Sequence, residues 1–115
     1  MLTQLVNTEM LKKLKFSAFK DEHVHFGGGV YRMFDKDDKI IYIGKSQDLQ
    51  RRIKTHLSGT TNTKYFIKQV RHIDWHKNDS PIMQTLLEAA LIAFYKPKMN
   101  DEVKDEVAHR KRARK

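Results

Sequence analysis

Two tyrosines are the first side chains of this sequence whose types and spacing could do chemistry together. Tyr31 and Tyr42 lie in two short apolar segments on either side of a turn at residues 35–38. If the turn is centred between Lys36 and Asp37, Tyr31 falls directly opposite Tyr42 on one face of a hairpin, where two phenol hydroxyls could approach one small target. Aromatic cross-strand pairs are also common sheet stabilisers, so the spacing alone leaves a purely structural role open.

The sequence Gly44-Lys45-Ser46 follows the second of these segments and precedes a basic amphipathic stretch. Ser46 is a good N-cap residue, so backbone N–H groups and the Lys45 ammonium are expected to meet at a helix N-terminus. Anions are favoured at such a place. We therefore predict an anion-binding position at the start of this helix.

The predicted helix carries basic side chains in two positions. Its apolar residues recur at helical spacing: Leu49, Ile53 and Leu57. Arg52 and His56 are four residues apart and share one face that borders this stripe, which favours a functional role for both. Arg51 and Lys54 point further round the helix, where a solvated charged face is the simpler interpretation.

Glu88 is the only ionisable acid within residues 80–95, and most of its neighbours in the sequence are apolar. Burying a lone carboxylate costs several kcal/mol unless a cation or a metal ion compensates its charge. The spacing alone supports two roles equally, a metal ligand and a structural partner of a lysine or arginine.

Three further side chains, His72, Asp74 and His76, would share one face of a predicted strand. This spacing could build a metal site, but a polar strand face has the same pattern and no further ligand is evident. The polar strand face is the preferred interpretation.

The elements that must position these residues follow from apolar periodicity and turn residues. We predict, in order, a short helix within residues 1–26, strands at 30–34 and 39–43, and a helix from Ser46 to about 58; after it come a helix at 62–69, a strand at 70–77 and a helix at 80–95. The last helix has Ser80 as its N-cap and Pro81 in its first turn, and its nearly continuous apolar surface predicts a central position. This order favours an α+β fold, with a small three-stranded antiparallel sheet flanked by helices.

The composition describes one basic domain. The chain has 115 residues with 23 Lys and Arg against 14 Asp and Glu, a formal net charge of +9. Such a charge indicates a polyanionic partner, most often nucleic acid, with an anionic membrane surface as the competing interpretation. The absence of cysteine excludes a disulfide framework and a cysteine nucleophile, and it fits a reducing cytoplasm. No segment reaches the ~20 apolar residues of a membrane helix, so no membrane partner is expected.

The strings Gly29-Val30-Tyr31 and Tyr42-Ile43-Gly44, followed by the basic helix and Glu88, resemble the GIY-YIG nuclease family. The first string and the four residues after it are especially similar to the N-terminal nuclease domain of bacterial UvrC-type excinucleases. Arg52 ten residues after Tyr42, and Asn100 twelve residues after Glu88, follow the layout of that domain. The resemblance runs from about residue 27 to residue 100.

The resemblance implies a role for each site residue. Tyr31 and Tyr42 would be paired active-site phenols, with Tyr31 as general base if nearby cations favour its phenolate. Arg52 would grip the scissile phosphate, while Tyr42 and His56 orient phosphate or water. Glu88 would bind one divalent metal ion, Mg²⁺ or Mn²⁺.

Supporting and DNA-contacting residues complete the implied site. Gly44 and Asn100 would hold the site together. Lys45 matches a lysine that follows the second motif in this family, and with Arg51 and Lys54 it is expected to contact DNA. The basic end of the tail lies outside the resemblance and is expected from its charge to contact phosphates: Arg110, Lys111 and Arg112. The chain would then divide into an N-terminal helical extension (1–26), a nuclease domain (27–100) and a charged tail (101–115).

The implied activity is that of a metal-dependent DNA endonuclease, which hydrolyses a phosphodiester bond to a 5′-phosphate and a 3′-hydroxyl. Because the sequence stops where a UvrC-type excinuclease would continue into further domains, we expect a free-standing nuclease. Two alternatives remain: a nucleic-acid-binding module that keeps the fold without turnover, and a nuclease that a partner protein directs to its substrate. DNA is the expected partner in each case.

Overall fold

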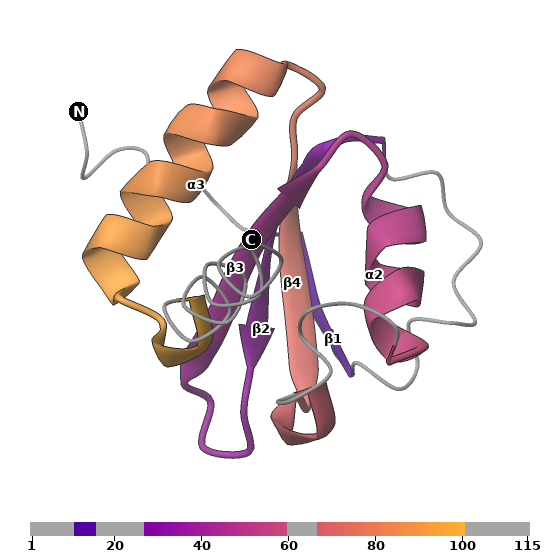
Figure 1. The fold of residues 1–115 in the computed structure, drawn as a ribbon, viewed down its shortest axis with the longest axis vertical. Coiled ribbons are helices and arrows are strands. Elements are labelled where there is room, and N and C mark those ends of the chain that lie inside the picture. Colours follow the sequence, from indigo (N-terminus) through magenta and orange to yellow (C-terminus); the bar gives the residue numbers. More distant parts are fainter. Residues whose placement is uncertain (1–10, 16–26, 60–66, 101–115) are drawn as a thin grey trace, which may run out of the picture.

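The computed structural model describes residues 27–59 and 67–100 and, as backbone, residues 11–15. Four antiparallel strands form one sheet in the order β1-β4-β2-β3. Their bounds are β1 Leu11–Lys15, β2 Gly29–Phe34, β3 Ile40–Ser46 and β4 His72–Lys77. Two helices, α2 (Leu49–Leu57) and α3 (Pro81–Tyr95), lie on either side of the strands (Figure 1). The predicted α+β architecture of an antiparallel sheet flanked by helices is confirmed.

The core divides between the two faces of the sheet because successive residues of a strand point to opposite sides. Tyr31 and Met33 of β2 belong to the cluster that includes Leu49 and Ile53 of α2. Val30, the neighbour of Tyr31 in β2, belongs to a second cluster that is completed by Ile43, Leu87 and Leu91. The sheet therefore separates a core under α2 from a core under α3.

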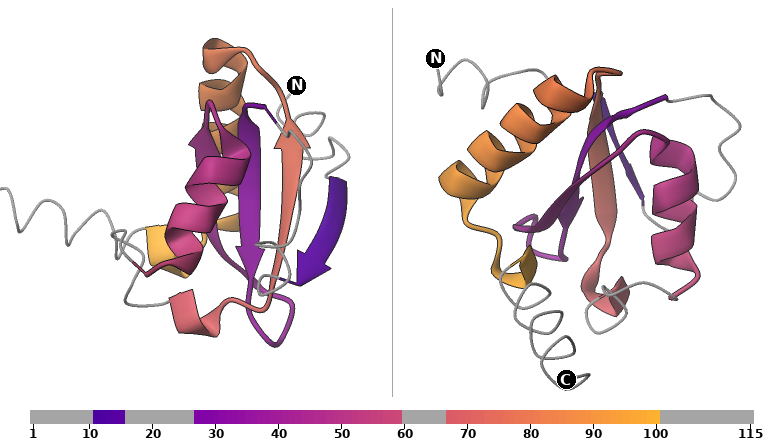
Figure 2. Two further views of the ribbon diagram at one scale, coloured as in Figure 1. Left: turned by 90° about the vertical axis from the view of Figure 1, so that its right-hand side faces the viewer. Right: turned by 45° about the horizontal axis from the view of Figure 1, so that its top comes forward.

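The N-terminal extension contributes a strand where a helix was predicted. Residues 11–15 form β1, in which Leu14 pairs with Ile73 and Lys15 with His72 of β4 (Figure 2). The two leucines have helical spacing, but the free edge of β4 offers backbone hydrogen bonds that a five-residue local pattern cannot outweigh. The prediction of a helix is wrong at these residues, and the three predicted strands gain a fourth. The rest of the predicted 1–26 extension lies outside the described residues.

The β2–β3 hairpin has a different register from the predicted one. Tyr31 pairs with Gly44 and Met33 pairs with Tyr42, so the prediction that Tyr31 lies directly opposite Tyr42 is wrong. The turn closes with Asp35 N–H donating to Lys39 O at 2.9 Å, which adds one residue, and a bulge beside Met33 adds another. Because a shift of two residues preserves the face of a strand, both tyrosines still share one face.

Helix α2 begins later than predicted. Its N-cap is Asp48, whose Oδ1 accepts a hydrogen bond from Arg51 N–H at 3.1 Å. Ser46 instead closes the turn before it, because its Oγ accepts from Asp48 N–H at 3.0 Å. Ser46 is therefore wrong as the N-cap, whereas the predicted end of the helix is confirmed, with Ser58 as C-cap and Gly59 at φ +74°.

The segment after α2 is described only from residue 67. The predicted helix at 62–69 lies mostly outside the described residues, and its last three residues, Ile67–Gln69, form a single 3-10 turn. The predicted strand 70–77 is confirmed as β4, which begins two residues later.

Helix α3 has the predicted bounds but not the predicted central position. Ser80 caps it and Pro81 opens its first turn, and it ends at Tyr95. Ile82 is 73% exposed and Phe94 58% exposed, because the small sheet covers only the side of the helix that carries its buried residues. Neither helix in the described ranges combines the length and apolar character that crossing a bilayer requires.

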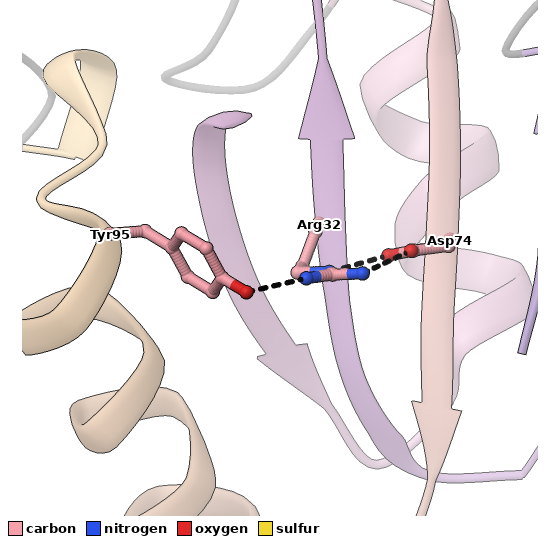
Figure 3. Close-up of polar contacts among 3 residues, drawn as sticks. All are labelled: Arg32, Asp74 and Tyr95. Atoms are coloured by element: carbon pink, nitrogen blue, oxygen red, sulfur yellow. Dashed lines mark hydrogen bonds and ion pairs between the residues drawn. The ribbon is translucent and has the colours of Figure 1, made fainter. Parts of the chain in front are cut away.

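A largely buried ion pair joins the strands to the end of α3 (Figure 3). Arg32 on β2 donates to both carboxylate oxygens of Asp74 on β4, at 2.9 Å from Nε and 2.5 Å from Nη2. Its Nη1 also donates to the hydroxyl of Tyr95 at 3.4 Å. Asp74 is thus occupied by Arg32, and no group of three or more His, Asp or Glu side chains in the described part of the chain could hold a metal ion. The polar strand face is the better interpretation of the pattern at residues 72–76.

Candidate active site

Tyr31, His56 and Gly44 form the centre of the site. The Tyr31 hydroxyl lies 2.6 Å from Nε2 of His56 in a buried hydrogen bond between β2 and α2. Tyr31 is 1% exposed and His56 is not exposed at all. The ring of Tyr31 lies against Gly44, where a Cβ atom would fall 2.9 Å from Cε1 and closer still to the hydroxyl. Glycine at position 44 is therefore needed because the phenol occupies the space of a side chain.

Tyr42 and Arg52 complete the α2 side of the site. The ring of Tyr42 lies 6.3 Å from that of Tyr31 and 5.9 Å from that of His56, so the three rings form one cluster. Tyr42 is half-buried, in contrast to Tyr31. Arg52 lies close enough to all three ring side chains for its charge to lower their pKa values. The helical spacing of Arg52 and His56 thus brings both to the tyrosine face, as predicted.

Burial makes the two phenols weaker acids than tyrosine side chains in water, because it raises the pKa of each. It raises the pKa of Tyr31, with a further increase from Tyr42, and Arg52 only partly opposes this. Burial also raises the pKa of Tyr42 against the opposing charge of Arg52. The charge of Arg52 alone therefore does not favour the phenolate of Tyr31, because the loss of solvation outweighs the attraction of the guanidinium, and the charge of a bound metal would have to be added to it.

His56 is held neutral. Burial, and secondarily the charge of Arg52, lower its pKa from 6.5 to about 3. A neutral imidazole has one ring nitrogen that accepts a proton, and Nε2 is the nitrogen beside the Tyr31 hydroxyl. Because a pKa of about 3 makes this imidazole a weak base, His56 positions the Tyr31 hydroxyl through the hydrogen bond instead of taking its proton.

Glu88 approaches the same cluster from α3. Its carboxylate is half-buried, and its charge contributes to the raised pKa of both Tyr31 and Tyr42. Burial raises the pKa of Glu88, while the ammonium of Lys45 opposes this increase. The ammonium itself donates to Oγ1 of Thr85 at 2.7 Å, one helical turn before Glu88. Thr85 is thus a member of the site that no motif or spacing in the chain selects.

Asn100 holds the outer edge of β3. Its Oδ1 accepts from the N–H of Ile43 at 2.9 Å, and its Nδ2 donates to the carbonyl of Ile43 at 2.8 Å. This side chain thus satisfies the backbone groups that an edge strand leaves open, directly between Tyr42 and Gly44. Such contacts give Asn100 a physical basis for the supporting role predicted from the resemblance.

The predicted DNA-contacting residues are only partly described. Arg51 and Lys54 lie on the exposed side of α2, around a hollow of about 520 Å³ that they share with Asp48. Lys45 lies near Glu88, on which its charge acts. The predicted contacts in the tail, Arg110, Lys111 and Arg112, lie outside the described residues.

A divalent cation fits this set of side chains. Mg²⁺ is usually held by one or two carboxylates, with water and substrate phosphates as its other ligands. Glu88 is the single acid at the cluster, it is half-buried, and a cation would compensate the charge that burial penalises. The donor set therefore suits a metal that binds together with a phosphate.

Most of the chain is similar in sequence to proteins that are already known. A family model described as a UvrC-like GIY-YIG domain matches residues 27–101. The chain is 40% identical over 80 residues to the UvrABC system protein C of Borrelia duttonii, an alignment that covers 68% of this chain and 13% of that protein. It is 32% identical over 84 residues to the corresponding protein of Haemophilus influenzae, covering 70% and 14% of the two chains. The chain thus spans about one seventh of the length of these relatives.

A solved structure with a similar fold is the GIY-YIG N-terminal endonuclease domain of UvrC from Thermotoga maritima, bound to its catalytic divalent cation, magnesium. The TM-score is 0.61 at 26% sequence identity, over 71% of this chain and 90% of that chain. A point mutant of the same domain, also bound to its catalytic divalent cation, has a TM-score of 0.61 over 71% of this chain and 89% of its own.

Proposed function

The chain belongs to the UvrC-like GIY-YIG family, and from this membership we propose that it is a divalent-metal-dependent DNA endonuclease. The reaction is hydrolysis of a phosphodiester bond to a 5′-phosphate and a 3′-hydroxyl. The observation that carries the proposal is the gathering of Tyr31, Tyr42, Arg52, His56 and Glu88 from both sides of the sheet around strand β3. A domain that only bound DNA would need basic side chains but not this arrangement of buried proton donors and acceptors.

Arg52 would bind the scissile phosphate. Its positive charge acts on both phenols, and the charge of Glu88 acts on the same two side chains. Negative charge grows on the phosphoryl oxygens as water attacks, and a positioned cation stabilises it. Tyr42, which is half-buried, would orient the phosphate or the attacking water.

Tyr31 would take the proton of the attacking water as a phenolate. Burial raises the pKa of this phenol, so the role would require the positive charge of Arg52 together with that of a bound metal. His56, whose Nε2 lies 2.6 Å from the Tyr31 hydroxyl, would orient the phenol.

Glu88 would hold one Mg²⁺ or Mn²⁺, with water as its other ligands. The metal would supply charge neutralisation at the phosphate and at the departing 3′ oxygen. Lys45, kept near Glu88 by Thr85, would add a second positive charge on the α3 side of the phosphate. We also propose that the nuclease domain of residues 27–100, whose sheet β1 extends by one strand, is followed by a charged tail at 101–115. Targeting by a partner protein is the proposal that the UvrABC names of the relatives support.

The test compares Glu88→Gln and Tyr31→Phe with the unaltered protein. Gln keeps the size of Glu but removes the charge that a metal needs, and Phe keeps the ring but removes the hydroxyl. Both variants should melt near the wild-type temperature and bind DNA, while nicking of labelled duplex and branched DNA falls at least about 100-fold. Mg²⁺, Mn²⁺ and chelator are compared on the same preparations.

Three results would contradict the proposal. Undiminished nicking in excess chelator would remove the metal. A Glu88→Gln protein that melts lower yet nicks at the wild-type rate would make Glu88 a structural ion-pair partner. An active Tyr31→Phe protein with an inactive Tyr42→Phe protein would transfer the base role to Tyr42.

A further inference from the structure

A second hollow, of about 510 Å³, lies at the hairpin end of β3, and none of the proposed catalytic residues lines it. Three lysines from two separate segments surround it: Lys39 just before β3, and Lys96 and Lys98 just after α3. All three are exposed. An apolar wall is provided by side chains that include Tyr95 and Met99. A hollow with this lining offers positive charge to an anionic chain.

The single carboxylate that lines this hollow offsets only one of the three lysine charges. Asp35 is engaged by the turn, because its Oδ1 accepts from the N–H groups of Asp37 at 2.8 Å and Lys39 at 3.0 Å. These bonds keep Asp35 in a structural role at the base of the hairpin. The lining of the hollow therefore contains three ammonium groups and one carboxylate, which already accepts two backbone hydrogen bonds.

The fold places the hollow on the same sheet edge as the proposed active site. β3 is an edge strand, and Lys39 precedes Gly44 by five residues, about 16 Å of extended chain. One strand of a DNA duplex presents about five phosphates over that length of helix axis. Because Asn100 is bonded to both the N–H and the carbonyl of Ile43, the segment that carries Lys98 is held against this edge.

The two ends of β3 differ in how their charges are arranged. At the end next to α2, Asp48 is the N-cap of the helix and Asp79 accepts from Gly28 N–H at 2.8 Å, and both exposed carboxylates lie at the same end as the exposed Lys45 and Lys77. At the hairpin end, Asp37 and Asp38 of the turn are exposed, but the hollow itself is lined by three lysines and one carboxylate. We propose that the bound DNA strand leaves the active site along β3 towards the hairpin, and that Lys39, Lys96 and Lys98 bind the phosphates of that flank.

This inference rests on the proposed function, since it takes the substrate to be DNA. It is tested with the double variant Lys39→Gln/Lys98→Gln, which leaves the left-handed Lys96 (φ 48°) untouched. The matched control is Lys13→Gln/Lys77→Gln, which also removes two charges but from β1 and β4, away from β3 in the sheet. DNA affinity is measured in chelator, so that no cleavage occurs, over a series of salt concentrations.

The hairpin double variant should reduce the slope of log affinity against log salt by about 1.8, because each lost phosphate contact contributes about 0.9. The control should change the slope by less than half of that amount. Shortening the duplex on one side of the nicking position should remove the difference between the wild type and the hairpin variant, and shortening the other side should not.

Equal slope changes in the two double variants, or no change in either, would overturn the inference while leaving the nuclease proposal intact. The same is true if shortening either side has the same effect. A wild-type protein that neither binds nor nicks DNA would instead overturn the proposed function. Melting temperatures near the wild-type value for both variants verify that only the charge was altered.

Discussion

The substitution Gly44→Ala adds one methyl group at the point where the ring of Tyr31 crosses β3. The new Cβ would lie 2.9 Å from Cε1 and closer to Cζ and the hydroxyl, whereas ordinary contact begins at 3.4 Å. Tyr31 is 1% exposed and packed among core residues, so it has little room to move away. The variant must therefore separate the ring from β3, and it disturbs the active site without replacing any proposed catalytic side chain.

The size of the effect follows from this geometry. Relieving the contact requires a displacement of about 1 Å, and a misplacement of that size can lower turnover by about 100-fold. The hydrogen bond of 2.6 Å between Tyr31 and His56 would lengthen or break. Overpacking of this kind also costs roughly 1–3 kcal/mol of stability. We expect DNA affinity to change little, because no phosphate-binding cation is removed.

The assay measures nicking rate, DNA affinity and the free energy of unfolding for Gly44→Ala, with Gly59→Ala as control. Gly59 has φ +74°, and no atom of the described residues lies within 4 Å of its Cβ position, so alanine there costs about 1–2 kcal/mol through backbone strain. Only Gly44→Ala should lose activity at a similar loss of stability. In a Tyr31→Phe background Gly44→Ala should cause little further loss, because both changes act through the same hydroxyl.

The reasoning would be refuted if Gly44→Ala nicks DNA within a few-fold of the wild-type rate. It would also be refuted if Gly59→Ala loses as much activity as Gly44→Ala, since loss of stability would then explain both variants.

Two further predictions concern Arg52, whose role in turnover is compared with its contribution to DNA affinity, and His56, whose protonation affects stability. Arg52→Ala should lower turnover about 100-fold or more with a small loss of DNA affinity. Arg51→Ala removes the same charge from the exposed side of α2 and should lower DNA affinity alone. Equal effects of the two variants in nicking and binding assays would refute the placement of Arg52. In the folded protein His56 is neutral, because its pKa is lowered from 6.5 to about 3. Between these two pH values the unfolded chain binds a proton at His56 that the folded chain does not. The free energy of unfolding should therefore fall as the pH falls from about 6.5 towards 3. In urea unfolding at pH 7.5 and pH 5, His56→Gln should reduce this dependence, and an unchanged dependence would show that other groups cause it.

The sequence alone predicted most of what depends on neighbours along the chain. Helix α3 is bounded by Ser80, Pro81 and Pro97, so local capping and backbone restrictions specify its limits. The four-residue spacing of Arg52 and His56 brought both to one face of α2, because helical geometry depends only on the chain itself. The two glycine–tyrosine strings and Glu88 were sufficient to indicate the family, and the family model confirms it.

Features that depend on distant groups required the tertiary structure. The helix predicted at residues 11–15 is a strand, because the edge of β4 offers hydrogen bonds that no local pattern reveals. The hairpin register changed through a turn and a bulge, each of which adds one residue. The raised pKa of Tyr31 and the lowered pKa of His56 come from burial between β2, β3 and α2, so spacing along the chain could not predict them. Residue types and local geometry thus selected the site, whereas solvation and contacts between distant segments determine how its protons can move.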